Sequence, residues 1–118
     1  MQENDLIVSV YSFYTRQPSY ENVELLEEST LVSIDYAQLQ QLYRTFPEFN
    51  FVGRVLTERY YVLSEERTLS LRLQTALERY HDLLKSNPLL FGRAPLKQIA
   101  SYLGMTPETL SRLRARRD

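Results

Sequence analysis

Polar and basic side chains that could read a nucleic acid gather near the end of the chain, between residues 106 and 117. Arginine can donate two hydrogen bonds to O6 and N7 of guanine, and glutamate can accept one from the amino group of cytosine. A helix N-terminus adds free backbone N–H groups, which suit a phosphate. The candidate DNA-binding residues are Thr106, Glu108, Thr109, Ser111, Arg112, Arg114, Arg116 and Arg117. Their types predict base contacts near the start of this segment and phosphate contacts from the terminal arginines.

Two short helices joined by one turn would position these side chains. Apolar residues recur at i, i+3, i+4 and i+7 over the first helix, which predicts one buried stripe. The stripe is Leu96, Ile99, Ala100 and Leu103, and Met105, Leu110 and Leu113 extend the buried set. Gly104 can adopt the left-handed conformation that ends a helix. Thr106 can cap the second helix, in which Pro107 would take the first position.

A tight helix-turn-helix with a polar, arginine-ended second helix is typical of proteins that read the major groove of DNA. The sequence therefore predicts a recognition helix over residues 107–117. The alternative interpretation is an ordinary helical hairpin with a solvated basic face. The coincidence of turn, cap and basic surface favours DNA.

Charge is divided unevenly along the chain, although its formal net charge is only −1. Residues 1–78 carry six Lys and Arg against twelve Asp and Glu, and residues 79–118 carry eight against three. A basic end on an acidic body is expected when only one end approaches phosphates.

The amino-acid composition argues against several classes of function. With 118 residues and no cysteine, the chain can bury one modest core and cannot form disulfides or thiolate metal sites. A single histidine, His81, leaves no basis for a catalytic triad or a zinc site, so we expect no enzyme activity and no catalytic, metal or cofactor residues. No apolar run is long enough for a membrane span, and the N-terminus does not resemble a signal peptide, which indicates the cytoplasm.

The first third of the chain predicts β-structure. Residues 6–13, 22–26 and 30–34 are rich in β-formers and are separated by turn residues. Three strands cannot close a barrel and would leave exposed edges. We therefore expect either that further elements complete this sheet or that the chain is a piece of a longer protein.

Helical patterns fill the middle of the chain. Asp35 should cap a short helix that ends before Pro47, and a much longer helix should begin near Glu48. Its narrow apolar seam is Phe49, Val52, Leu56, Tyr60 and Leu63. Such a seam on a long helix predicts homodimerisation, with packing on the chain's own sheet as the alternative. The pattern loses phase near residues 69–71, and a capping box at Thr75 and Glu78 should start a new helix that runs to about Ser86.

In this order, the pieces resemble the Crp/Fnr family of bacterial transcription regulators, in particular its Bacteroidetes branch. The resemblance rests on residues 25–36, on the run Glu78-Arg79-Tyr80 and, most specifically, on residues 99–112. Glu108, Ser111 and Arg112 match the family's recognition positions.

The resemblance implies an α+β fold with three parts. These are a partial β-roll effector domain (1–47) similar to cyclic-nucleotide-binding domains, a long dimerisation helix and hinge (48–74), and a helix-turn-helix of the winged-helix type (75–118). It also implies double-stranded DNA, RNA polymerase and an unidentified small-molecule effector as partners. The chain departs from the family where classical members bind cyclic AMP, with Val8-Ser9 and Ser19-Tyr20 at the phosphate-binding positions, so cyclic AMP is not expected. No segment for a wing follows the recognition helix.

Two functions remain as hypotheses. The first is a dimeric transcriptional regulator that reads a palindromic operator through residues 107–117. The second is a non-enzymatic ligand-binding or scaffolding module whose basic helix contacts protein or RNA. Only the first predicts a preference among duplex sequences.

Overall fold

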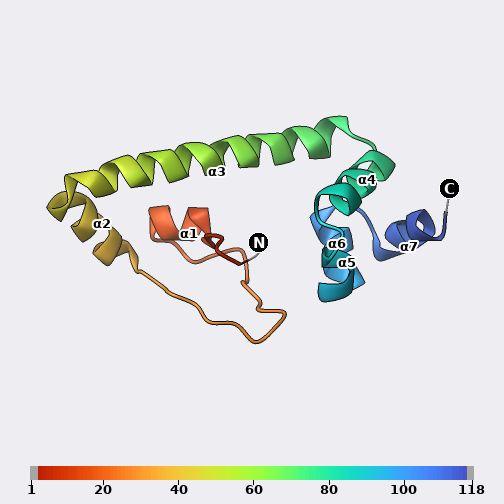
Figure 1. Ribbon diagram of the computed structural model, residues 1–118, viewed down its shortest axis with the longest axis horizontal. Helices are drawn as coiled ribbons and strands as arrows, with labels where there is room; N and C mark the ends of the chain where they lie inside the picture. The colour runs from red at the N-terminus through yellow and green to blue at the C-terminus, as the bar shows by residue number, and fades with distance from the viewer. Residues whose placement is uncertain (1–2, 117–118) are drawn as a thin grey trace. The chain divides into compact units, whose positions relative to one another are not determined.

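Every secondary-structure element in the part that the computed structural model describes, residues 3–116, is a helix (Figure 1). The helices of this part are α1 (Val10–Thr15), α2 (Tyr36–Thr45), α3 (Pro47–Leu73), α4 (Ala76–Ser86), α5 (Leu90–Arg93), α6 (Leu96–Tyr102) and α7 (Pro107–Ala115). Packing divides the chain into two compact units, Met1–Arg54 and Val55–Asp118. The division falls inside α3, whereas the domain boundaries expected from the sequence follow helix ends.

The predicted α+β fold with a β-roll remnant is wrong. Within residues 3–116 there is no strand: 6–9 is irregular, 10–15 is helix α1, and 22–26 and 30–34 form no β-ladder. The physical reason is that a strand is stabilised by ladder hydrogen bonds and a shared apolar face, which one segment cannot supply alone. The β-formers of this stretch, among them Val23, Leu31 and Val32, are accordingly exposed.

In the first unit, an arginine joins α1 to α2. Arg16 ends α1 with a left-handed φ of 63°. Its Nη1 donates to the carbonyl oxygen of Phe13 at 2.8 Å, and its guanidinium lies 4.8 Å from the ring centroid of Tyr36. A cation–π contact thus holds Arg16 against the first residue of α2.

The start of α2 confirms its predicted cap. Asp35 accepts from the backbone N–H of Gln38, whose side chain accepts in return from the backbone N–H of Asp35. Further along α2, Tyr43 lies so close to α3 that a Cβ added at Gly53 would meet its hydroxyl at 2.5 Å. Partial burial raises the pKa of Tyr43, and the neighbouring Tyr14 adds to this effect.

Helix α3 confirms the predicted long helix. It runs without interruption through the 69–71 region, where the apolar pattern loses phase, and ends at Leu73. None of its residues is buried. Of the predicted seam, Phe49, Val52, Leu56 and Leu63 are exposed and Tyr60 is half-buried. The alternative of packing on a sheet of its own is removed for the described residues, which contain no sheet, and dimerisation stays a prediction.

The core of the second unit forms between α4, α6 and α7. Its buried cluster is Leu83, Ile99, Ala100, Leu103 and Leu110, with Leu113 also buried and Tyr80, Leu90, Phe91, Ala94, Leu96 and Met105 packed against it. The stripe predicted for the helix-turn-helix is thus confirmed. On α4, Leu83 is buried in this core, whereas Leu77 and Leu84 are exposed.

Candidate nucleic-acid interface

The turn between α6 and α7 has the predicted geometry. Gly104 has a φ of +66°, and the backbone N–H of Met105 donates to the carbonyl oxygen of Ala100 at 3.0 Å. A Cβ added at Gly104 would lie 2.9 Å from Cδ2 of Leu71 on α3. Glycine is therefore favoured here twice, by the left-handed backbone and by the close approach of α3.

Replacing Gly104 with alanine should destabilise the helix-turn-helix by about 1–2 kcal/mol, because a Cβ in the left-handed region clashes with the following carbonyl oxygen. The measurement is amide hydrogen exchange of α6 and α7 in the full chain. Gly92→Ala is the matched control: Gly92 lies in α5 with a negative φ and open space around its Cβ position. Equal exchange in the two variants would contradict the requirement at Gly104.

Helix α7 begins with two hydroxyl groups that are linked to each other and to an arginine. The Thr106 side chain accepts from the backbone N–H of Thr109 at 3.1 Å, and the two hydroxyls lie 2.9 Å apart. Nη2 of Arg112 donates to Oγ1 of Thr109 at 3.3 Å. Thr109 is half-buried and links the helix cap to Arg112, and its predicted contact with DNA stays a prediction. The exposed guanidinium of Arg112 is thus partly oriented before any ligand arrives.

The other predicted contact residues occupy the solvent side of α7 and the residue after it. Buried Leu110 and Leu113 define the inner face. The exposed set is Thr106, Glu108, Ser111, Arg112, Arg114 and Arg116. Arg116 follows the last helical residue, and Arg117 lies outside the described residues. The helix therefore spans Pro107–Ala115 within the predicted 107–117.

One terminal arginine also has an aromatic neighbour. The guanidinium carbon of Arg114 lies 5.9 Å from the ring centroid of Phe91, which packs edge-on against Tyr80 at 5.7 Å. This distance is near the limit of a cation–π contact, and Arg114 remains exposed. The sequence does not reveal this pairing, because Phe91 belongs to the short helix α5.

A residue that is not among the predicted site residues joins three elements of the second unit. Arg79, on α4, donates from Nε to the carbonyl oxygen of Leu103 at 2.7 Å and from Nη1 to that of Gln74 at 2.6 Å. Leu103 ends α6, and Gln74 follows the last residue of α3. Arg79 therefore ties the end of the long helix to the turn of the helix-turn-helix.

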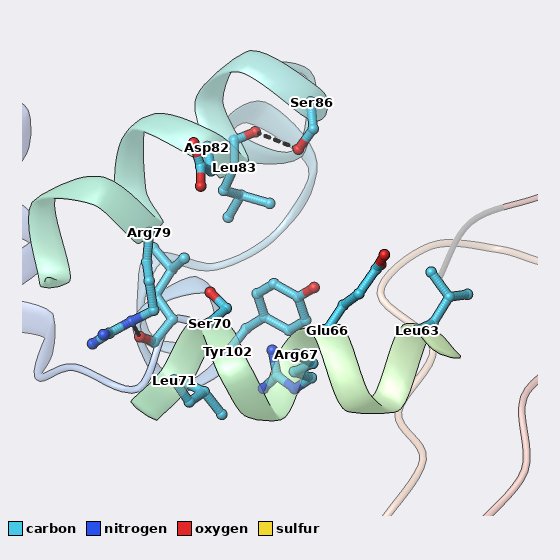
Figure 2. Close-up of a pocket in the computed structure, with 11 residues that line it drawn as sticks. Leu63, Glu66, Arg67, Ser70, Leu71, Arg79, Asp82, Leu83, Ser86 and Tyr102 are labelled. Atoms are coloured by element: carbon cyan, nitrogen blue, oxygen red, sulfur yellow. Dashed lines mark hydrogen bonds between the residues drawn. The ribbon is translucent and has the colours of Figure 1, made fainter. Parts of the chain in front are cut away.

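Beside Arg79 lies an open groove of about 270 Å³ between α3, α4 and α6 (Figure 2). Arg79 is at one end of the groove and Leu63 at the other, with Tyr102 between them. The Arg67 guanidinium lies 4.1 Å from the centroid of the Tyr102 ring. The groove means that α3 is not packed tightly against α4 and α6 here.

The junction of α3 and α4 confirms the predicted capping box. The Thr75 hydroxyl accepts from the backbone N–H of Glu78, and the Glu78 carboxylate accepts from both the N–H and the hydroxyl of Thr75. These hydrogen bonds hold the pKa of Glu78 below its usual value. Gln74 donates to the Asp82 carboxylate at 2.6 Å and accepts from the Ser70 hydroxyl.

The described part of the chain offers no group of three or more His, Cys, Asp or Glu residues that could hold a metal ion. His81 is exposed on α4, beside the ring of Tyr80. Among the helices of residues 3–116, none is long and apolar enough to cross a membrane.

Comparisons of the chain with known protein families, curated proteins and solved structures find no match.

Proposed function

We propose that the protein binds double-stranded DNA sequence-specifically and regulates transcription, as the resemblance to Crp/Fnr regulators implies. The observation that carries the proposal is the arrangement of α7. Two leucines bury its inner face in the core, while Glu108, Ser111 and Arg112 are exposed near its start. The N-terminal part of a recognition helix is the part that contacts base edges in helix-turn-helix proteins.

The roles differ along the helix. Arg112 donates to a guanine, Glu108 accepts from a cytosine, and Ser111 meets a base edge or a phosphate. The backbone N–H of Glu108 and the Thr106 hydroxyl contact a phosphate. Arg114, Arg116 and Arg117 position the duplex through their positive charge. This role belongs to the cytoplasm, where a bacterial chromosome lies.

A dimer formed along the α3 seam would present two such helices. Val52 and Leu56 represent the seam, and both leave apolar surface in water in the single chain. Covering that surface with a second copy removes it from water and is favourable. Two recognition helices related by a two-fold axis read a palindrome whose half-sites lie about one helical turn apart. An effector or RNA polymerase would act on this dimer.

The test is selection of duplexes from a random pool by the full chain at two salt concentrations. We expect enrichment of a palindrome that persists at the higher salt, because base contacts add affinity beyond counterion release. Enrichment of a single half-site would support sequence-specific DNA binding and contradict the dimer. Binding that collapses with salt and enriches no sequence would refute the proposal, and the scaffolding hypothesis would then be favoured.

A further inference from the structure

We propose that Arg79 is a positioning residue that sets the orientation of the helix-turn-helix relative to the end of α3. In a dimer it would thereby set which half-site spacing the protein accepts. The effect on half-site spacing, which is the second consequence, rests on the proposed DNA-binding function. The effect on the orientation of the helix-turn-helix concerns only the second unit.

The hydrogen bonds of Arg79 reach two segments far apart in sequence. One acceptor, the carbonyl oxygen of Leu103, lies 24 residues away at the end of α6, and the other, that of Gln74, follows α3. Both acceptors are at helix C-terminal ends, where carbonyl groups lack intrahelical partners and a positive charge is favoured. A planar guanidinium can serve two such acceptors at once in a fixed geometry.

Helix α3 is loosely packed in this unit. No residue of α3 is buried, and the groove of about 270 Å³ separates it from α4 and α6. The hydrogen bonds of Gln74 with Ser70 and Asp82 also link the end of α3 to α4. Contacts of α3 with α6 and its turn include the stacking of Arg67 on Tyr102 and the approach of Leu71 to Gly104. Arg67 and Leu71 are both exposed, so these contacts are weak restraints beside the two charge-assisted hydrogen bonds of Arg79.

The core does not depend on Arg79. The buried cluster lies between α4, α6 and α7, and none of its members belongs to α3. Loss of the guanidinium should therefore leave the helix-turn-helix folded while freeing its orientation relative to α3. That combination separates a positioning role from a purely structural one.

The first experiment measures this orientation directly, without DNA. Because the chain has no cysteine, Glu65→Cys on α3 and Ala115→Cys on α7 supply the only labelling sites. Spin-label distances are recorded by pulsed electron paramagnetic resonance in the full chain, diluted with unlabelled protein to remove distances between copies. We expect one narrow distribution for the parent and a broadened or shifted one for Arg79→Gln.

Two further variants control the measurement. Arg79→Lys keeps the charge but loses the planar fork, and should give an intermediate distribution. Arg72→Gln removes an exposed arginine from the last turn of α3 and should leave the distribution unchanged. An unchanged distribution in Arg79→Gln would overturn the proposal. So would loss of hydrogen-exchange protection in α6 and α7 in both Arg79 variants, because Arg79 would then stabilise the core itself.

The second experiment varies the spacing between the half-sites of the selected palindrome. Arg79→Gln should select the same bases as the parent. Its preference for the best half-site spacing, measured against a spacing one base pair longer or shorter, should fall about tenfold. That is roughly the effect of losing one charge-assisted hydrogen bond. Retention of the parent's spacing preference would overturn the second consequence. If the parent selects no sequence, the proposed function fails, and the spin-label result still decides the role of Arg79 in the fold.

Discussion

Replacing Arg112 with alanine is expected to weaken binding of the selected palindrome by about 1–3 kcal/mol for each half-site and to relax the preference at one symmetric base pair. The Arg112 guanidinium is exposed near the start of α7. Its Nη2 donates to the Thr109 hydroxyl, so part of its conformational freedom is already restricted before DNA binds. The measurement is the affinity for the palindrome and for duplexes changed at each position, at fixed salt.

The matched control for Arg112→Ala is Arg116→Ala, which removes the same charge just beyond the helix. A phosphate-contacting arginine should weaken all duplexes about equally and reduce the salt dependence by about one counterion per site. Equal and sequence-independent losses in both variants would mean that Arg112 acts through charge alone. Base reading by Arg112 would then be contradicted.

Replacing Leu110 with alanine is expected to destabilise the second unit by about 2–5 kcal/mol. The Leu110 side chain is 0% exposed and sits where α7 meets the cluster of Leu83 and Ile99. Removing it leaves a cavity in a core of few residues, so the lost burial is a large share of the stability that a small domain has. Amide hydrogen exchange of α6 and α7 in the full chain would report the loss.

Leu89→Ala is the control for Leu110→Ala, because Leu89 is 73% exposed and its truncation should change stability by less than about 0.5 kcal/mol. We expect Leu110→Ala to lose DNA binding together with exchange protection, and Leu89→Ala to keep both. Full protection of α6 and α7 in Leu110→Ala would show that the core lies elsewhere.

Helices α2, α3, α4, α6 and α7 could be predicted because their signals are local, whereas α1 lies where a strand was predicted. The caps at Asp35, Thr75 and Thr106 and the glycine at 104 act on backbone groups within a few residues, so the sequence alone locates these helix ends. The apolar stripe of α6 and α7 likewise follows from the helical repeat. The absence of strands from residues 3–116 could not be predicted in this way. A β-former such as Val32 indicates only that a strand would be tolerated if a partner were present.

Contacts between distant residues were decided only by the tertiary structure. The type of residue at 79 does not reveal that its guanidinium bonds carbonyl oxygens at 74 and 103, because every residue has a carbonyl and the fold selects which ones come near. The same applies to Thr109, whose sequence position suggests DNA contact and whose packing turns its hydroxyl toward Arg112. Thus the sequence by itself determined the helix-turn-helix, its caps and its basic outer face, through interactions within one helical turn. The tertiary structure decided that the described part of the first third forms no sheet and that Arg79 joins α3 to the turn, because both depend on which distant groups meet.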